Sequence, residues 1–217
     1  MRIAGVDDAG RGCVIGPLVI AGVLVDEEAV ERLRLLGVHD SKTLSPRRRE
    51  LLAAEIKEIA LDYTYFEIPP RAIDRVVERG VKLRRLNYLE ALAMAEVIRR
   101  LKPDIVYVDA SDIDAERFKG HILSALREKP QIVSEHEADA RYPVVAAASI
   151  LAKVRRDSII RELQRRYGDF GSGYPHDSRT VKFLEDWFRR NPREVPPFIR
   201  GSWSTVKRIR RKLLFQG

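Results

Sequence analysis

The chain has 217 residues, of which 45% are hydrophobic, so it can form one medium-sized domain with a well-filled core. It has 40 Lys and Arg against 32 Asp and Glu, and the formal net charge of +8 suggests a polyanionic partner without identifying one. The single cysteine, Cys13, excludes an internal disulfide framework, and the uncharged segment 13–25 is too short to span a bilayer. A soluble cytoplasmic protein is expected.

Two β-strands are predicted at 2–7 and 13–25, because both segments are rich in Val and Ile and are separated by glycines. Asp7, Asp8 and Arg11 interrupt this apolar sequence. Buried charge is costly unless it is paired or binds a metal ion. Three interpretations compete here: a structural salt bridge, a phosphate-binding glycine turn, or a metal site.

The middle of the chain alternates helical and extended patterns. Ser45 as N-cap and Pro46 at the first helical position predict the start of a helix. The pattern that follows predicts a strand at 62–68, a helix at 83–101, a strand at 104–110, a helix near 114–128 and a short strand at 131–135.

The last third begins with a predicted long helix at 142–168, which is apolar first and basic later. A Gly, Pro and Ser loop at 168–180 follows, and then short helices around Trp187 and Trp203. We therefore predict an α/β domain over 1–170 and a helical region over 171–212. Residues 213–217 resemble a trimmed affinity-tag protease site and carry no fold prediction.

Two motif matches are incomplete. The spacing Gly10-x-Gly12-x-x-x-Gly16 is one residue off the dinucleotide fingerprint, and a strand rather than a helix is predicted to follow it. The sequence His-Glu-Ala-Asp-Ala at 136–140 lacks the second histidine of a zinc protease. With four His and one Cys in the chain, a metal would bind mainly oxygen, which suits Mg²⁺ or Mn²⁺.

Four acidic residues lie at the ends of separate core elements: Asp7, Asp8, Asp109 and Asp139. Each alone is more often a turn former or helix cap. Together they favour a divalent metal site, because clustered carboxylates repel one another unless a cation neutralises them. Asp7 and Asp8 can reach one metal pair only if the chain turns between them. In a basic protein, such a site predicts a nuclease that uses two metal ions.

Six segments, in the same order, resemble the motifs of type 2 ribonuclease H, the archaeal ribonuclease HII family. They are GVDDAGRGCVIGPLVIAGV, DSKTLSPRRR, YVDASD, HEADARYPVVAAASILAKVRRD, GDFGSGYPHDSRT and GSWSTVK, and the match extends to about residue 206. The resemblance implies an α/β RNase H-like fold with a mixed five-stranded sheet flanked by helices, plus a small C-terminal helical region.

The resemblance also implies an activity. The expected reaction is endonucleolytic hydrolysis of the RNA strand of RNA/DNA hybrids, and cleavage at ribonucleotides embedded in DNA. Two divalent ions, Mg²⁺ or Mn²⁺, are expected, with products that carry 3′-hydroxyl and 5′-phosphate ends. A monomer is expected, with a sliding clamp as a possible partner.

Site roles follow residue by residue from the same resemblance. Metal binding and catalysis fall on Asp7, Asp8, Asp109 and Asp139; contact with the nucleic acid falls on Gly10, Arg11, Gly12, Ser41, Lys42 and Tyr174; auxiliary roles fall on Lys153 and Arg179. Glycines allow a close approach to the ribose 2′-hydroxyl, which separates RNA from DNA. The alternatives are a loop tyrosine packed on the C-terminal region for Tyr174 and a solvated loop lysine for Lys42.

Two positions depart from the family pattern. Asp8 stands where the family usually has Glu, and Glu137 stands where it often has Lys. Two other functions stay open from the sequence: another RNase H-like nuclease, such as a junction resolvase, and a hybrid-binding protein whose catalytic site is impaired.

Overall fold

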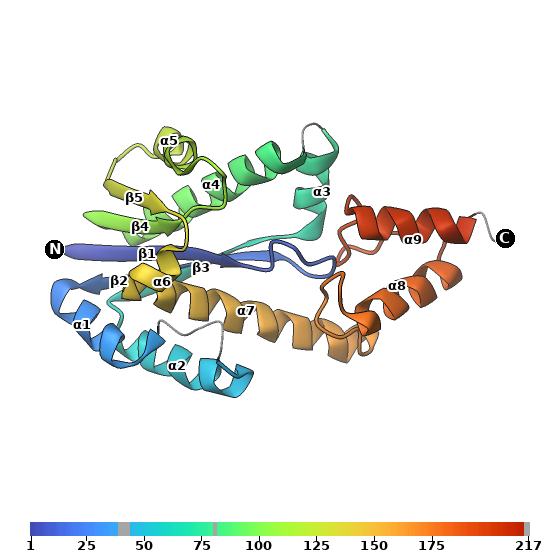
Figure 1. The fold of residues 1–217 in the computed structure, drawn as a ribbon, viewed down its shortest axis with the longest axis horizontal. Helices are drawn as coiled ribbons and strands as arrows, with labels where there is room; N and C mark the ends of the chain where they lie inside the picture. The colour runs from blue at the N-terminus through green and yellow to red at the C-terminus, as the bar shows by residue number, and fades with distance from the viewer. Residues whose placement is uncertain (39–43, 80–81, 215–217) are drawn as a thin grey trace.

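Five strands form one mixed sheet in the order β3-β2-β1-β4-β5, as Figure 1 shows. The central strand β1 (Arg2–Ala9) pairs antiparallel with β2 (Leu18–Asp26) and parallel with β4 (Ile105–Asp109). At the two edges, β3 (Asp62–Ile68) pairs antiparallel with β2, and β5 (Gln131–Glu135) pairs parallel with β4. The predicted mixed five-stranded sheet is confirmed.

Helices cover both faces of this sheet. Helices α3, α4 and α5 lie on one face, α1, α2 and α7 lie on the other, and α8 and α9 lie together beyond the end of the sheet (Figure 1). The computed structural model describes residues 1–38, 44–79 and 82–214. Its helices in these ranges are α1 (Glu27–Leu35), α2 (Pro46–Ile59), α3 (Pro70–Glu78), α4 (Lys82–Leu101), α5 (Ala115–Ala125), α6 (Ala138–Arg141), α7 (Pro143–Tyr167), α8 (Ser178–Arg190) and α9 (Ser204–Leu214).

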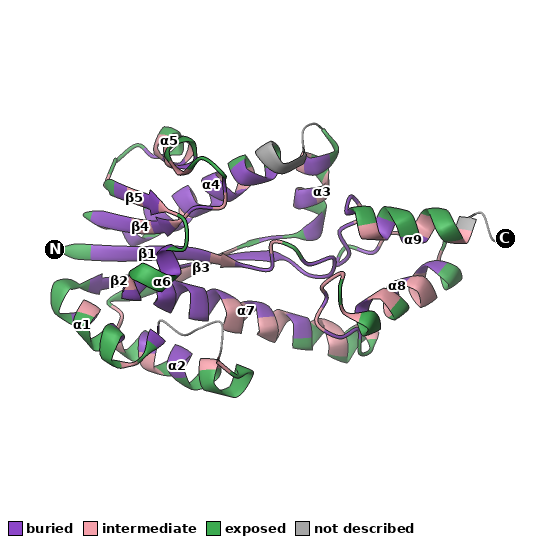
Figure 2. Ribbon diagram, viewed as in Figure 1, coloured by how far each residue is buried: buried purple, intermediate pink, exposed green. Residues whose placement is uncertain are grey.

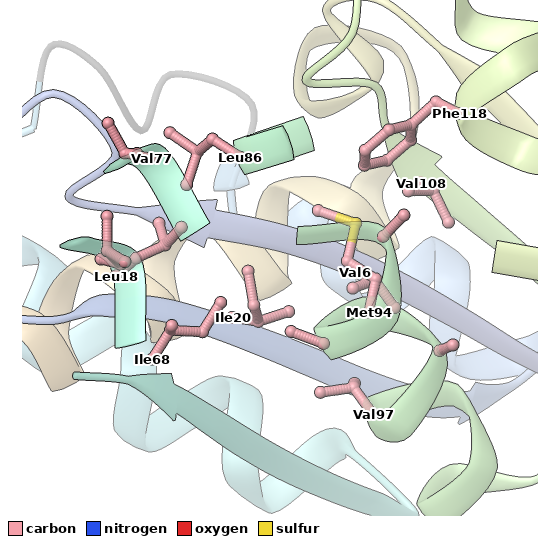
Figure 3. Close-up of a cluster of buried hydrophobic side chains, with 14 of the residues drawn as sticks. Val6, Leu18, Ile20, Ile68, Val77, Leu86, Met94, Val97, Val108 and Phe118 are labelled. Carbon is pink, nitrogen blue, oxygen red and sulfur yellow. The ribbon is translucent and has the colours of Figure 1, made fainter. Parts of the chain in front are cut away.

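The sheet separates two hydrophobic clusters, and both faces of its central strands are buried (Figure 2). Val6, Ile20 and Met94 belong to the cluster between the sheet and α4, which Figure 3 shows. The same cluster includes Phe188 and Trp203 from the C-terminal region. The domain boundary near residue 170 stays a prediction, and the segments on its two sides share this cluster.

Local sequence signals explain several element boundaries. The Ser45 side chain accepts a hydrogen bond from the backbone N–H of Arg48, which confirms the predicted cap of α2. The long helix predicted at 142–168 is confirmed as α7, with Pro143 at its first position. The short helix α6 was not predicted; it directly precedes α7 and contains Asp139.

The strand predicted at 13–25 begins only at Leu18. Residues 13–17 form part of a turn, and Gly16 has a φ of +91°. The backbone N–H groups of Val14, Ile15 and Gly16 bond to the C-terminal part of the chain instead of a neighbouring strand. Val14 donates to the carbonyl of Gly173 (2.8 Å), and Gly16 donates to that of Phe198 (2.8 Å).

Gly5 provides a test of the packing between β1 and α7. A Cβ atom there would overlap the carbonyl group of Val144 at the start of α7. We expect Gly5→Ala to lower the free energy of unfolding by about 1–3 kcal/mol or more, because the rigid helix backbone has to shift. Chemical denaturation measures this change.

The matched control is Gly120→Ala in α5, where an added Cβ meets nothing within 4 Å. This change is expected to raise stability by up to about 1 kcal/mol, because alanine favours a helix. Equal effects at Gly5 and Gly120 would contradict the described contact between β1 and α7.

Candidate active site

Asp7, two residues before the end of β1, and Asp109, the last residue of β4, lie at the carboxyl ends of two neighbouring parallel strands. Val6 pairs with Val108, and each aspartate is the next residue along its strand. The valines belong to the cluster on the α4 face, so the aspartates point to the opposite face, toward α6 and α7. Asp7 is 5% exposed there.

Helix α6 brings Asp139 to these strand ends. Its first residue, Ala138, donates its backbone N–H to Oδ1 of Asp109 at 2.9 Å. Asp139 follows directly in the chain and is buried. Two strand ends and one short helix thus bring Asp7, Asp109 and Asp139 to one region.

Asp8 lies on the other face of β1. The strand continues to Ala9 with no turn between Asp7 and Asp8, so the two side chains leave opposite faces of β1, but, beyond the effect of burial, the charge of Asp8 still raises the pKa of Asp7. The half-buried Asp8 accepts a hydrogen bond from Oγ of Ser111 at 3.2 Å. In the described part of the chain, no three His, Cys, Asp or Glu side chains lie close enough together to form a metal site, so Asp7, Asp109 and Asp139 share one side of the sheet without forming a preassembled set of ligands.

The electrostatics of Asp7 fit a site for a cation. Burial raises the pKa of Asp7 well above its ordinary value, and the charges of Asp8 and Asp109 raise it further. Hydrogen bonds from Ser149 and from the backbone N–H of Asp8 (2.7 Å) oppose this shift. A divalent cation would relieve the repulsion, and carboxylate oxygens are the donors that Mg²⁺ and Mn²⁺ prefer.

A buried arginine from the C-terminal region fixes the turn after β1. The Arg200 guanidinium donates to the carbonyl oxygens of Gly10 (2.7 Å), Arg11 (2.7 Å) and Gly16 (3.1 Å). Gly10 has a φ of +90°, and a Cβ atom there would meet the Arg156 side chain at 2.8 Å. The sequence pattern did not single out Arg200, although a lone arginine after the apolar pair at 198–199 was a possible signal.

The Arg11 side chain turns inward, toward α4. Its Nη1 donates to the carbonyl of Ser111 (3.0 Å), and its Nη2 donates to Oδ1 of Asn87. Its Nε lies 3.1 Å from Oε1 of Glu90, which is fully buried. Neither Asn87 nor Glu90 was predicted as a site residue, because the helical pattern at 83–101 gave no sign that these two polar residues face the sheet.

Tyr174 lies beside the glycine turn. A Cβ atom on Gly12 would be 3.9 Å from Cε1 of Tyr174. The Arg156 guanidinium carbon lies 4.7 Å from the centre of the tyrosine ring, and the ring of His176 stacks on it at 5.5 Å. Burial raises the pKa of Tyr174, so the phenol is neutral near pH 7. The structure thus brings together Gly12 and Tyr174, two residues predicted to contact the nucleic acid.

Two predicted auxiliary residues, Lys153 and Arg179, are more peripheral. Lys153 is half-buried on α7, and Arg179 is exposed and pairs with Asp169 and Asp177. Ser41 and Lys42 lie outside the described residues. The roles assigned to these four residues stay predictions. Among the described residues, no helix is both long and apolar enough to cross a membrane.

Comparisons with known proteins give one family. A family model described as Ribonuclease HII matches residues 4–206. A curated Ribonuclease HII from Methanosarcina mazei is 47% identical over 221 residues, which cover 98% of this chain and 99% of that protein. The crystal structure of the ribonuclease H2 from Pyrococcus horikoshii OT3 is similar with a TM-score of 0.90 and 43% identity, and covers 99% of both chains.

A further solved structure, of the PCNA:RNase HII complex from Archaeoglobus fulgidus, is similar with a TM-score of 0.84 and 42% identity. The similarity covers 99% of this chain and 100% of that one.

The buried position of Asp7 predicts a gain of stability when its charge is removed. With a chelator present, Asp7→Asn is expected to raise the free energy of unfolding by about 1–2 kcal/mol, because the amide keeps much of the hydrogen bonding and relieves the repulsion by Asp8 and Asp109. Chemical denaturation near pH 8 measures the difference. Added Mn²⁺ is expected to stabilise the wild type more than the variant.

The control is Asp62→Asn, at an exposed strand start where the carboxylate bonds to the N–H of Tyr63. Asp62→Asn is expected to change the free energy of unfolding by no more than about 0.5 kcal/mol. Destabilisation by Asp7→Asn in the chelator would mean that the negative charge of Asp7 is compensated by the protein itself.

Proposed function

The chain belongs to the ribonuclease HII family, and we propose that Asp7, Asp8, Asp109 and Asp139 carry its metal-dependent catalysis. The protein is a type 2 ribonuclease H, an endoribonuclease with an RNase H-like fold, and this family is metal-dependent. The observation that carries the proposed site is the parallel register of β1 and β4, which puts buried Asp7 beside Asp109.

The four carboxylates have different parts in this proposal. Asp7 and Asp109 offer oxygen ligands from adjacent strand ends, Asp139 offers one from α6, and Asp8 approaches from the α4 face. Two Mg²⁺ or Mn²⁺ ions held there would supply an activated water and neutralise charge on the leaving oxygen. Hydrolysis would leave 3′-hydroxyl and 5′-phosphate ends.

Substrate selection is assigned to the turn at 10–12 and to Tyr174. The proposed substrates are RNA/DNA hybrids and duplex DNA that contains ribonucleotides. The backbone of the glycine turn can approach a 2′-hydroxyl closely, and the Tyr174 ring beside Gly12 can stack on the following deoxyribose. The net charge of +8 favours binding of the phosphate backbone, and Lys42 is one proposed contact.

The cellular context belongs to the same proposal. We expect a monomer that acts in the cytoplasm, where a reducing environment suits a chain with one cysteine. The relative from Archaeoglobus fulgidus forms a complex with PCNA, which supports a sliding clamp as a partner.

One assay tests the function. A duplex with a single ribonucleotide, a continuous RNA/DNA hybrid and a four-way DNA junction are incubated with the protein, with and without Mg²⁺. We expect Mg²⁺-dependent cleavage of the first two, with 3′-hydroxyl and 5′-phosphate ends. Binding without cleavage would favour a hybrid-binding protein, and cleavage of the junction alone would favour a resolvase.

Asp109→Asn is expected to abolish cleavage and leave hybrid binding within about twofold, because most of the affinity comes from phosphate contacts elsewhere. The control is Asp104→Asn at the other end of the same strand segment, where the carboxylate bonds to the N–H of Arg2. Single-turnover cleavage and binding in a chelator measure the two effects. Substantial Mg²⁺-dependent cleavage by Asp109→Asn would remove this residue from the site.

Tyr174→Ala is expected to impair cleavage at a lone ribonucleotide more than cleavage within a continuous hybrid. The proposed role of the ring is to contact the deoxyribose after the ribonucleotide, so a uniform hybrid depends on it less. Tyr174→Phe keeps the ring and is expected to retain this preference. Equal loss on both substrates would make Tyr174 a general packing residue.

A further inference from the structure

Glu90 is a buried carboxylate that the proposed mechanism does not use. It lies on α4, is 0% exposed, and its Oε1 is 3.1 Å from Nε of Arg11. Neither oxygen of Glu90 accepts a hydrogen bond of good geometry from a described residue, so the contact with Arg11 is an ion pair. Removing one partner of a buried pair leaves an uncompensated charge, which makes such pairs sensitive to substitution.

Asn87 lies about one turn before Glu90 on α4 and binds the same guanidinium. Its Oδ1 accepts a hydrogen bond from Nη2 of Arg11. Its side chain also bonds to Asp112, which Arg117 holds by a further ion pair. Arg11 is thereby held by α4 on one side and by the carbonyl of Ser111 on the other.

Four charges meet beneath the turn at 10–12. Burial, and after it the charge of Asp8, raise the pKa of Glu90 well above its ordinary value, and the charges of Arg11 and Arg200 oppose this rise only in part. Two acidic and two basic side chains therefore interact in a region where Glu90 and Arg200 are both fully buried. Loss of one member leaves the other three unbalanced next to the main chain of the turn.

The three nitrogens of the Arg11 guanidinium all face protein groups. This arrangement makes the side chain an anchor for the turn. Arg200 also holds the carbonyl groups of Gly10 and Arg11. The conformation of the turn therefore depends on side chains from α4 and from the segment between α8 and α9.

We propose that Glu90 and Asn87 are positioning residues, which hold Arg11 so that the main chain of 10–12 recognises a ribose 2′-hydroxyl. This inference rests on the proposed function of the turn. It assigns to α4 a part in distinguishing a ribonucleotide from a deoxyribonucleotide, without contact between α4 and the nucleic acid.

The test measures discrimination separately from stability. Dissociation constants are measured in a chelator for a DNA duplex with one ribonucleotide and for the same duplex without it. Glu90→Gln is expected to reduce the ratio of the two affinities roughly five- to tenfold, because the hydrogen bond to the 2′-hydroxyl is misplaced. The affinity for the all-DNA duplex is expected to change little. The matched control is Glu96→Gln on the same helix, where the carboxylate pairs with Arg99 and Arg100; its ratio is expected to equal that of the wild type.

A double-mutant cycle tests whether Glu90 acts through Arg11. In the Arg11→Met background, Glu90→Gln is expected to cause little further loss of discrimination, because the partner is already absent. An unchanged ratio in Glu90→Gln, or losses that multiply in the double variant, would overturn the proposal. If Glu90→Gln does not fold, Asn87→Ala takes its place, because it removes an uncharged hydrogen-bond acceptor of Arg11. An unchanged affinity ratio in Asn87→Ala would then overturn the proposal.

The wild type separates this inference from the proposed function. If the wild-type protein neither cleaves at the ribonucleotide nor favours the duplex that contains it, the proposed function fails. If the wild type discriminates and Glu90→Gln discriminates equally well, only the positioning role fails.

Discussion

The parallel pairing of β1 with β4 determines where the acidic residues of this chain lie. With Val6 opposite Val108, the next residue on each strand is an aspartate, and both point toward α6 and α7. In the absence of a metal ion, a buried, charged carboxylate next to other carboxylates destabilises the folded protein. The raised pKa of Asp7 reflects this cost. The same arrangement favours a bound divalent cation, so stability and function oppose each other at this edge.

The C-terminal region takes part in the site through the turn that follows β1. Arg200 bonds to three carbonyl groups of that turn, and Gly173 and Phe198 accept hydrogen bonds from its N–H groups. The loop that carries Tyr174 packs against the same turn. Because these contacts come from the loop before α8 and from the segment between α8 and α9, the geometry of 10–16 depends on the position of the C-terminal region at the end of the sheet.

The sequence predicted the five strands and the acids at their ends because these features are local. Segments rich in Val and Ile, the Ser45 cap and Pro46 at the start of a helix need no knowledge of distant contacts. The segment 13–17 was predicted as strand because it is apolar, but its backbone bonds to residues some 160 positions or more away. Helices α1 and α3 were not predicted, and the positive φ of Glu137 before α6 has no signal in its residue type. The roles of Glu90 and Arg200 could not be predicted, because they depend on tertiary contacts.

Anomalous diffraction from crystals soaked in Mn²⁺ would show whether Asp7 and Asp109 hold the metal. We expect an anomalous peak in direct contact with carboxylate oxygens of both residues, with Asp8 or Asp139 close enough to complete the coordination. A Mn²⁺ peak bound elsewhere on the protein, with none between Asp7 and Asp109, would contradict this expectation.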